Sequence, residues 1–324
     1  MLNSALTNEL FKMPQVSVIL PNYNHSIYLD KRIKSILDQT FQDFELIILD
    51  DCSTDNSKEI IEKYRFHERV SHIIYNEVNG GSTFKQWDKG IQLAKGEFIW
   101  IAESDDYCEP NFLSELIPPL KNDTDLVIVF CQSLFVTPEE KIVNKTEATD
   151  LIKKISGEDF LKKYMLGFNA IANVSMAVFR KNTILSISPE YKSFLYCGDW
   201  FFYASMCLKG SVFISGKYLN YYLRHEKSVT SNLTKMGYDF FEGNKVFYFI
   251  KNNVQVNDED ITRGLNERID LYIKLKDVLD AGVKQNVIKS ILELDPSAQG
   301  LLRKRLRWLQ IRKTFSGLKK IITS

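Results

Sequence analysis

The sequence has little of what marks secreted, membrane-spanning or nucleic-acid-binding proteins. Its five cysteines are odd in number and form no C-x-x-C pair, which argues against a disulfide framework or a zinc site. No apolar run approaches the roughly 18 residues that a membrane-spanning helix needs, and residues 1–14 lack the basic start and apolar core of a secretory signal. The 42 Lys and Arg nearly balance the 41 Asp and Glu, so we expect no nucleic-acid partner. These absences predict a protein of the reducing cytoplasm, soluble or peripheral to a membrane.

The sequence does contain enough apolar residues for a large core, 44% of 324. Short β-branched runs alternate at first with stretches of helical apolar spacing, the pattern of parallel strands joined by crossover helices. A capping-box pattern at Asn56 and Glu59 precedes one of the expected helices. The expected strands are Val16–Leu20, Glu45–Leu49, Ser71–Tyr75, Phe98–Ala102 and Asp125–Phe130. The fold class is therefore α/β, a Rossmann-like sandwich with a mostly parallel central sheet.

The later part of the chain has a less regular order. It mixes helices with strands expected at Val174–Phe179, Val212–Ile214 and Tyr218–Leu223, and then follows helical spacing to its end. The expected limits are an N-terminal extension at 1–14, an α/β domain at 15–230 with halves 15–130 and 131–230, and a small helical C-terminal region at 231–324.

Polar residues follow the expected strands. Ligands of open α/β sheets bind at the carboxyl ends of the strands. The residues there are Pro21-Asn22-Tyr23-Asn24, Asp50-Asp51-Cys52-Ser53-Thr54-Asp55, Glu103-Ser104-Asp105-Asp106 and, before a later helix, Gly198-Asp199-Trp200. Acidic clusters on one edge repel one another unless a cation or hydrogen-bond donors neutralise them. We therefore expect a divalent metal, Mn²⁺ or Mg²⁺, which takes few protein carboxylates and fills its shell with phosphate and water oxygens. The alternative is that Asp105 and Asp106 only cap the helix that starts near Pro110.

The ordered series of motifs resembles family 2 glycosyltransferases. The series consists of Val16 to Asn24, similar to the opening strand and P-x-Y-N turn; Asp50 to Ser57, similar to D-D-G-S-T-D-x-[ST]; Asn79-Gly80-Gly81, Gly90-Ile91 and Ala94 to Glu97, which lead into the paired aspartates; and Tyr222 to Thr230, similar to the closing Y-R-x-H-x-x-S-[VIT]. These matches cover about two thirds of the chain. The resemblance implies a GT-A fold and an inverting, metal-dependent transfer of a sugar from a nucleotide-sugar to an acceptor hydroxyl.

The resemblance also implies a role for each matching position. Asp199 is similar to the general base that removes the acceptor proton, and Trp200 beside it would face the acceptor. Asp51 would accept a hydrogen bond from the nucleotide base, for which the N3 proton of uracil is suited. Asp105 would approach the ribose or the metal, and Asp106 would coordinate the metal that bridges the two phosphates. The implied donor-binding set is Pro21, Tyr23, Asn24, Asp51, Lys85, Asp105, Asp106, Arg224 and His225.

Three departures from the family pattern leave details open. They are Glu103 for the first aspartate of D-x-D-D, Gly198 where the family often has the glutamate of E-D, and Phe84-Lys85-Gln86-Trp87-Asp88 for the common A-R-N. It stays open whether Lys85 supplies the missing cation, and whether Arg224 and His225 contact the diphosphate or lie only on the surface. Asp50 and Asp55 are expected to organise their turn through hydrogen bonds to the backbone, and His25 to serve packing or the surface.

The end of the chain is basic. Residues 301–324 contain eight Lys or Arg and no acid, with Leu, Trp, Phe and Ile between them at helical spacing. Two interpretations stay open: a helix on an anionic membrane surface, or a terminal helix packed on its own domain. Membrane contact would suit a lipid-linked acceptor in cell-surface polysaccharide synthesis, at the inner face of the plasma membrane.

Other function classes lack their motifs. No G-x-G-x-x-G follows the first strand, which disfavours an NAD enzyme, and the same loop lacks the glycine-rich basic character of a nucleotidyltransferase. The alternative that stays is a catalytically inactive nucleotide-sugar-binding or scaffold protein of the same fold. Retention of Asp106 and Asp199 favours the enzyme.

Overall fold

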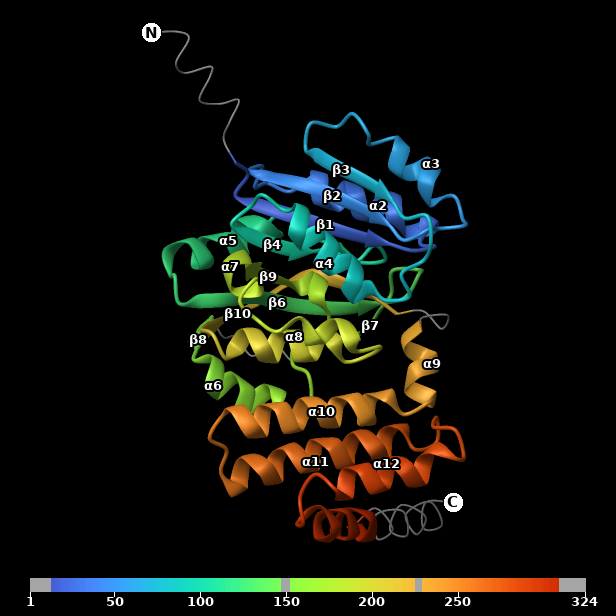
Figure 1. Cartoon of the computed structure of the whole chain (residues 1–324), viewed down its shortest axis with the longest axis vertical. Helices are drawn as coiled ribbons and strands as arrows, with labels where there is room; N and C mark the ends of the chain where they lie inside the picture. Colours follow the sequence, from blue (N-terminus) through green and yellow to red (C-terminus); the bar gives the residue numbers. More distant parts are fainter. Residues whose placement is uncertain (1–12, 147–151, 225–228, 309–324) are drawn as a thin grey trace, which may run out of the picture. The chain divides into compact units, whose positions relative to one another are not determined.

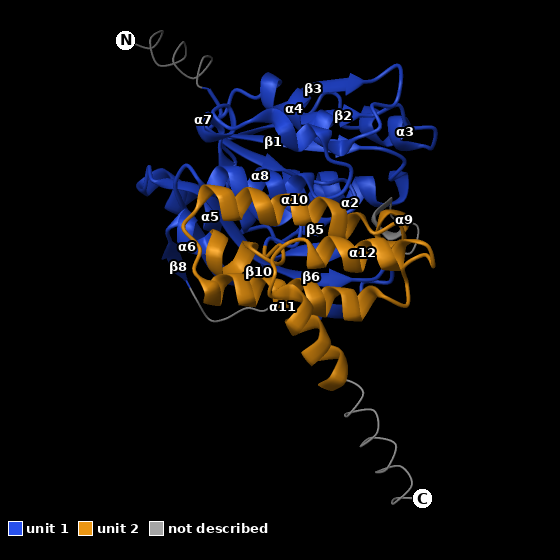
Figure 2. Cartoon of the chain, turned by 60° about the horizontal axis from the view of Figure 1, so that its bottom comes forward, with its two compact units in different colours: residues 1–160, 171–226 blue, residues 161–170, 227–324 orange. Residues whose placement is uncertain are grey.

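The chain forms two compact units. The computed structural model describes residues 13–146, 152–224 and 229–308. The α/β unit comprises residues 1–160 and 171–226, and the helical unit comprises residues 161–170 and 227–324 (blue and orange in Figure 2). Residues 161–170, expected from the sequence in the α/β domain, group with the C-terminal helices.

A central sheet organises the α/β unit, with strand order β3-β2-β1-β4-β9-β6-β10-β5 (Figure 1). Its strands are β1 (Val16–Asn22), β2 (Phe44–Asp50), β3 (Val70–Tyr75), β4 (Phe98–Ile101), β5 (Tyr107–Cys108), β6 (Leu126–Val136), β7 (Ile142–Lys145), β8 (Lys153–Ile155), β9 (Ala177–Arg180) and β10 (Ser211–Leu223). Strand β1 pairs in parallel with β2 and β4, as do β2 with β3 and β6 with β10, whereas β9 runs antiparallel between β4 and β6. The strands β3, β2, β1, β4, β6 and β10 therefore run in one direction, which confirms the predicted mostly parallel sheet.

The structure corrects two details of the sequence prediction. The strands expected at 212–214 and 218–223 are one strand, β10, with register shifts near Ile214 and Tyr218. The predicted capping box is wrong, because the Asn56 side chain makes no capping hydrogen bond. The preceding Asp55 accepts the Ser57 N–H instead, at 3.0 Å.

Helices cover both faces of the sheet. They are α2 (Ser26–Leu37), α3 (Ser57–Glu62), α4 (Thr83–Leu93), α5 (Phe112–Asn122), α6 (Gly157–Phe160), α7 (Lys181–Ile184) and α8 (Gly198–Cys207), with 3₁₀ turns η2 (Val174–Met176) and η3 (Pro189–Ser193). On one face, Trp100 of β4 stacks on Phe112 of α5 and lies beneath Arg32 of α2. On the other face, α8 packs its rings on Phe179 of β9, and α4 approaches β1 so closely that a Cβ at Gly90 would lie 2.3 Å from Ile19.

The helical unit has its own core. Its elements are the π-helical turn η1 (Leu161–Met165), α9 (Val229–Lys235), α10 (Tyr238–Asn253), α11 (Asp258–Leu275) and α12 (Val283–Leu292), followed by a helix over residues 298–308. Buried apolar side chains hold these helices together, namely Phe240, Ile269, Tyr272, Leu279, Val287, Ile291 and Leu302. Helix α11 begins with a capping box, in which Asn257 Oδ1 accepts the Asp260 N–H at 2.9 Å.

The basic end of the chain is described only in part. Leu302 is 7% exposed and belongs to the core of the helical unit, whereas Trp308 is 47% exposed. Arg305 pairs with both carboxylate oxygens of Asp270, at 2.7 and 2.6 Å. Residues 309–324, which carry the rest of the predicted membrane-binding stretch, lie outside the described residues. Among the helices that the structure describes, none joins the length and the apolar character required to cross a bilayer.

Candidate active site at the carboxyl ends of the strands

The turn after β2 is held by its own aspartates. Asp50 accepts hydrogen bonds from Asn22 Nδ2 at 2.8 Å and from the Ser53 N–H at 2.9 Å, and Asp55 accepts from Ser57. The predicted structural role of Asp50 and Asp55 is therefore confirmed. Their hydrogen bonds join the ends of β1 and β2 in a fixed loop.

Three residues predicted to bind the donor lie on the β1 side of this loop. Pro21 is buried at the end of β1, whereas Tyr23 is 45% exposed and presents its ring to solvent. Asn24 turns its Oδ1 toward the loop and accepts the Thr54 N–H at 2.8 Å. Cys52, where the family pattern has glycine, has a φ of 64°, which lies in the left-handed region that non-glycine residues seldom adopt.

Asp51 is fixed by donors from three directions. Its Oδ1 accepts from Asn76 Nδ2 at 2.6 Å, from the Gly80 N–H at 2.9 Å and from Gln86 Nε2 at 2.8 Å. The Gly80 N–H also reaches Oδ2, at 3.1 Å. Lys85 lies at the same place, with its Nζ 2.9 Å from the Gly80 carbonyl oxygen. The first turn of α4 thus supports the loop that carries Asp51.

The same turn of α4 supports the E-S-D-D loop, residues 103–106. Trp87 Nε1 donates to Glu103 Oε1 at 2.8 Å, and Thr83 Oγ1 lies 3.2 Å from the same oxygen. Burial and the charge of Asp105 raise the pKa of Glu103 to about 7, although these two hydrogen bonds act to lower it. Because Gln86 and Trp87 are neighbours in α4, the helix links Asp51 to Glu103.

Asp106 lies in the interior, with 2% of its surface exposed. Asn173 Nδ2 donates to its Oδ2, and the Leu223 N–H donates to its Oδ1 at 3.1 Å. Burial, and then the charge of Asp105, raise the pKa of Asp106 above its ordinary value. Helix α5 has Asn111 at its N-cap, so neither aspartate occupies the capping position, and the capping alternative is wrong.

Tyr222 of β10 has three of the predicted site carboxylates as neighbours. Burial raises its pKa to about 12, Arg224 opposes this rise, and the charges of Asp106, Asp105 and Asp199 add to it. The Arg224 guanidinium lies 4.5 Å from the centre of the Tyr222 ring. His225, predicted with Arg224 to contact the diphosphate, lies outside the described residues.

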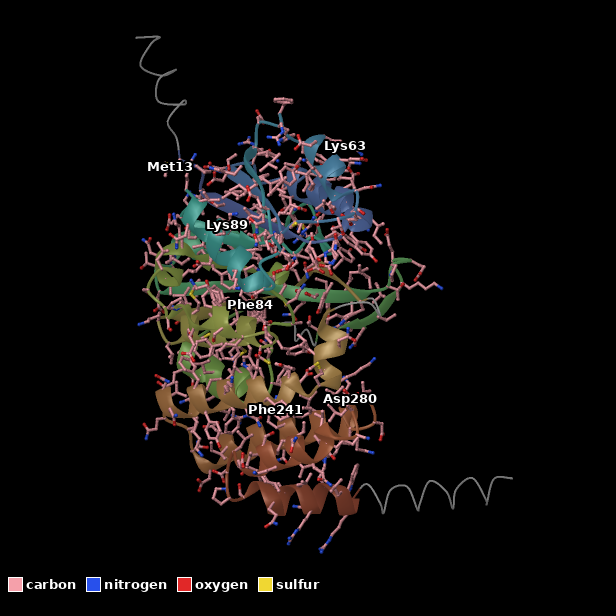
Figure 3. All side chains as sticks on the ribbon, turned by 45° about the vertical axis from the view of Figure 1, so that its right-hand side comes forward. Met13, Lys63, Phe84, Lys89, Phe241 and Asp280 are labelled. Atoms are coloured by element: carbon pink, nitrogen blue, oxygen red, sulfur yellow. The ribbon has the colours of Figure 1, made fainter. Side chains whose placement is uncertain are left out.

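The start of α8 explains two departures from the family pattern together. A Cβ at Gly198 would lie 2.5 Å from Cε2 of Phe84, in the first turn of α4 (Figure 3), and 2.7 Å from the Tyr191 carbonyl oxygen. A glutamate at this position would require both the Phe84 ring and the Tyr191 backbone to move. Next to Gly198, Asp199 Oδ1 accepts the Trp200 N–H at 2.7 Å. Trp200 is 4% exposed, which leaves little of its ring for an acceptor.

Two residues near the site escaped the sequence prediction. Arg32 is fully buried 5.0 Å above the Trp100 ring, and its charge opposes the raised pKa values of Glu103 and Asp106. The sequence does indicate that Arg32 is buried, because this residue falls on the apolar face of its helix, among Leu29, Ile33 and Ile36. His25, expected to serve packing or the surface, has its Nδ1 2.8 Å from Ser104 Oγ in the E-S-D-D loop.

The acidic residues fit a metal that takes few protein ligands. Among residues 13–146, 152–224 and 229–308, no three His, Cys, Asp or Glu side chains are grouped to hold a metal ion. Mg²⁺ is often bound by one or two carboxylates together with phosphates and water, which suits Asp105 and Asp106. Burial is the main cause of the raised pKa of Asp106, and the like charge of Asp105 adds to it; a bound cation would offset this second contribution.

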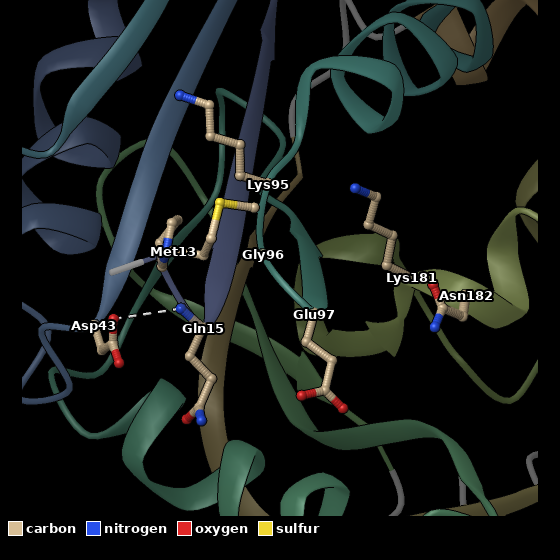
Figure 4. A pocket seen from close by; sticks show the side chains of 9 residues that line it. Met13, Gln15, Asp43, Lys95, Gly96, Glu97, Lys181 and Asn182 are labelled. Carbon is tan, nitrogen blue, oxygen red and sulfur yellow. Dashed lines mark hydrogen bonds between the residues drawn. The ribbon is translucent and has the colours of Figure 1, made fainter. Parts of the chain in front are cut away.

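A separate pocket lies where β1 begins, at the opposite ends of the strands. Its lining includes Gln15, Asp43, Lys95 and Lys181, and the Gln15 N–H donates to Asp43 Oδ1 at 3.3 Å (Figure 4). None of the strand-end acids lines it, so it is distinct from the candidate active site.

Comparisons with known proteins agree with the sequence motifs. A family model described as Glycosyl transferase family 2 matches residues 17–183. The chain is similar to glycosyltransferase GlyG of Streptococcus pneumoniae, with 38% identity over 35% of this chain and 38% of the relative. It is also similar to the GalNAc(5)-diNAcBac-PP-undecaprenol beta-1,3-glucosyltransferase of Campylobacter jejuni, with 26% identity over 71% of this chain and 72% of the relative. Its fold resembles S. aureus TarS 1–349 in complex with UDP, with a TM-score of 0.55, 16% identity and coverage of 90% and 91% of the two chains, which confirms the predicted GT-A fold.

Proposed function

We propose that this chain, which belongs to glycosyl transferase family 2, is an inverting, metal-dependent enzyme that moves a sugar from a UDP-sugar to an acceptor hydroxyl. The main support is the neighbourhood of Tyr222, where the charges of Asp105, Asp106 and Asp199 meet at the carboxyl ends of the strands. An edge of this kind is where open α/β sheets bind their ligands.

The donor would lie across the ends of β1, β2 and β4. In this proposal Asp51 accepts a hydrogen bond from the base, and the half-exposed ring of Tyr23 stacks on it, next to Pro21 and Asn24. The diphosphate would lie toward the E-S-D-D loop. Its charge would be met by the metal and by three cationic candidates, Lys85, Arg224 and His225.

Asp105 and Asp106 would hold the metal, Mn²⁺ or Mg²⁺. When bound, such an ion offsets the negative charge that develops on the leaving diphosphate. Asn173 and the Leu223 N–H support this role, because their hydrogen bonds fix the orientation of the Asp106 carboxylate.

Asp199 would act as the general base. The acceptor oxygen forms a bond to the anomeric carbon on the face opposite the diphosphate, and the carbon–oxygen bond to the diphosphate breaks. The acceptor proton passes to the Asp199 carboxylate, and the configuration at the anomeric carbon is inverted. The position of Asp199 in the first turn of α8 supports this role, because the helix fixes its backbone.

The proposed acceptor is a glycan, lipid-linked or part of a cell-surface polysaccharide. The support is the C. jejuni relative, whose name includes an undecaprenol-linked glycan. The proposed location is the cytoplasm, at the inner face of the plasma membrane, with the basic residues of 301–324 toward anionic lipid. Replacing Arg303, Lys304 and Arg307 by glutamate should abolish flotation with anionic liposomes, and unchanged flotation would end the membrane proposal.

Thermal unfolding with a panel of nucleoside diphosphates tests the central proposal. A ligand that binds only the folded protein stabilises it, so UDP with Mn²⁺ should raise the Tm of the wild-type protein. Asp106→Asn should lose the part of the shift that depends on Mn²⁺. If no nucleotide raises the Tm with or without Mn²⁺, the proposed donor site is wrong. Binding without UDP release from UDP-sugars and glycan acceptors would instead favour the inactive scaffold.

A further inference from the structure

The two oxygens of the Asp51 carboxylate differ in how many donors they meet. Oδ1 accepts from Asn76, Gly80 and Gln86, at 2.6, 2.9 and 2.8 Å. Oδ2 meets only the shared Gly80 N–H among the described residues, at 3.1 Å. A carboxylate oxygen has two lone pairs, so three donors leave Oδ1 no capacity for another. Only Oδ2 remains for a ligand.

Gln86 and Asn76 hold this arrangement in place. A carboxylate only accepts hydrogen bonds, so the amide nitrogens of both side chains must face Asp51. Asn76 is oriented further by Lys89, whose Nζ donates to its Oδ1 (Lys89 is labelled in Figure 3). Gln86 is 4% exposed, and its Oε1 is buried without a hydrogen-bond partner in the described part of the chain. A buried acceptor of this kind needs a donor from ligand or water.

We infer that Gln86 and Asn76 together determine the specificity for the nucleotide base, because their hydrogen bonds to Asp51 Oδ1 leave a single acceptor oxygen for a single ring N–H. This inference rests on the proposed nucleotide-sugar donor and its base contact at Asp51. It goes beyond that contact because it assigns the selection between bases to Gln86, on α4, and to Asn76, which follows β3.

The site would distinguish the bases by the number of hydrogen-bond donors that each one presents to Asp51. Uracil offers one ring N–H, which Oδ2 can accept. Guanine offers an N1–H and an amino group side by side, and a carboxylate takes both only when both of its oxygens are available. With Oδ1 saturated, one guanine donor is left without a partner when it is buried, which weakens binding by about 10- to 100-fold. Hypoxanthine has the size of guanine but only the N1–H, so it isolates the effect of the amino group.

Selection of guanine instead of uracil is also chemically possible at this site. If Gln86 Oε1 accepted the guanine amino group while Asp51 Oδ2 accepted N1–H, the same residues would select guanine. The two recognitions predict opposite orders for GDP and IDP, so one binding series separates them.

Calorimetric titration of the full chain with UDP, IDP and GDP in the presence of Mn²⁺ tests the inference. We expect the wild-type protein to bind UDP most tightly, then IDP, then GDP. Gln86→Leu combined with Asn76→Ala leaves Oδ1 only the Gly80 N–H that it shares with Oδ2, and should narrow the ratio of the UDP and GDP affinities several-fold. The matched control is Gln92→Leu, an exposed position in the same helix, which should leave the ratio unchanged.

A second variant protects the test against a folding defect. Gln86→Leu alone leaves Oδ1 with the Asn76 and Gly80 donors, so it should narrow the same ratio less than the double variant does. Tighter binding of GDP than of IDP by the wild-type protein would overturn the inference, as would an unchanged ratio in the folded double variant. The absence of binding by any of the three nucleotides would instead refute the proposed donor site itself.

Discussion

Each unit of the molecule buries one arginine almost completely, but the two guanidinium groups differ in their hydrogen bonds. Arg268 of the helical unit is 1% exposed and donates to Asn244 Oδ1 and to the carbonyl oxygens of Asp239 and Phe240. Arg32 of the α/β unit is 0% exposed, and its guanidinium nitrogens make no hydrogen bond to an oxygen or nitrogen of the described residues. A buried charge without hydrogen bonds is costly, so the two sites cannot serve the same purpose.

The difference extends to the surroundings of each arginine. Helix α11, which carries Arg268, begins with a complete capping box at Asn257. Around the strand ends of the α/β unit, by contrast, Gln86 Oε1 and the Tyr203 hydroxyl are buried without partners, and Glu103 has a raised pKa. The helical unit also has a buried acceptor without a partner among the described residues, Asp239 Oδ2, but such groups gather with Arg32 and Glu103 where we propose that a charged ligand binds.

The largest expected effect is on turnover and belongs to the α/β unit alone. Asp199→Asn removes the proposed base and should lower the rate of sugar transfer by roughly 10² to 10⁴, with little change in Tm. A matched change in the helical unit, Asp277→Asn at an exposed position, should leave the rate unchanged. Steady-state assays with UDP-sugar and acceptor measure both. Unchanged turnover in Asp199→Asn would refute its assignment as the base.

One pair of variants tests whether the two buried arginines contribute differently to the free energy of unfolding. Arg268→Met leaves buried acceptors without donors and should lower the free energy of unfolding by about 3 kcal/mol. Arg32→Met removes a buried charge that acts on Glu103 and Asp106 without a hydrogen bond to either, and it should lower the free energy of unfolding by less, about 1 kcal/mol. Urea denaturation measures both. Equal losses would show that Arg32 is as well paired as Arg268.

The pH dependence of stability should differ between wild type and Glu103→Gln in metal-free buffer. The folded pKa of Glu103, about 7, lies above its ordinary value of 4.5, so the folded state holds the proton more tightly. This contribution to stability is present below pH 4.5 and is lost as the pH rises toward about 7, about 3 kcal/mol in total. Glu103→Gln should remove that loss in urea titrations across this range. The same pH profile in both proteins would contradict the raised pKa.

Glycine substitutions extend the comparison to packing. Gly198→Ala places a methyl group against Phe84 and should lower the free energy of unfolding by about 2 kcal/mol, part of which Phe84→Leu should restore. Gly300→Ala, in a helix with no atom within 4 Å of the new methyl group, should stabilise by about 0.5 kcal/mol. Denaturant unfolding of the single and double variants is the measurement. Additive effects of Gly198→Ala and Phe84→Leu would show that the two positions are independent.

The smallest effect concerns backbone strain in the β2 turn. Cys52→Gly relieves a φ of 64° and should raise the free energy of unfolding by about 0.5 kcal/mol, after the greater flexibility of glycine in the unfolded chain is counted. Glu140→Gly, with a φ of 61° in the turn between β6 and β7, is the control and should behave alike. A loss of stability in Cys52→Gly alone would mean that its thiol contact with the Glu77 carbonyl oxygen outweighs the strain.

Residues close in the chain account for most of what could be predicted. The alternation of apolar runs with helical spacing is a local pattern, and it identified strands β1, β2, β3, β4 and β6 and the parallel character of the sheet. Asp50 and Asp55 were assigned to the turn because their partners, Ser53 and Ser57, lie two or three residues away. The ordered motifs identified the family for the same reason, since each is a short contiguous segment.

Only the tertiary structure decided which side chains meet across long separations. Asp106 is held by Leu223, 117 positions later, and Asp51 by Gln86, 35 positions later. The Phe84 ring lies beside Gly198 and leaves little room for a side chain there, although no local sequence pattern connects the two positions. Hydrophobic spacing records which face of a helix or strand is buried, but not which distant group that face will meet. For this reason the sequence by itself determined the fold class and the candidate acids, while the partners that fix them followed from packing.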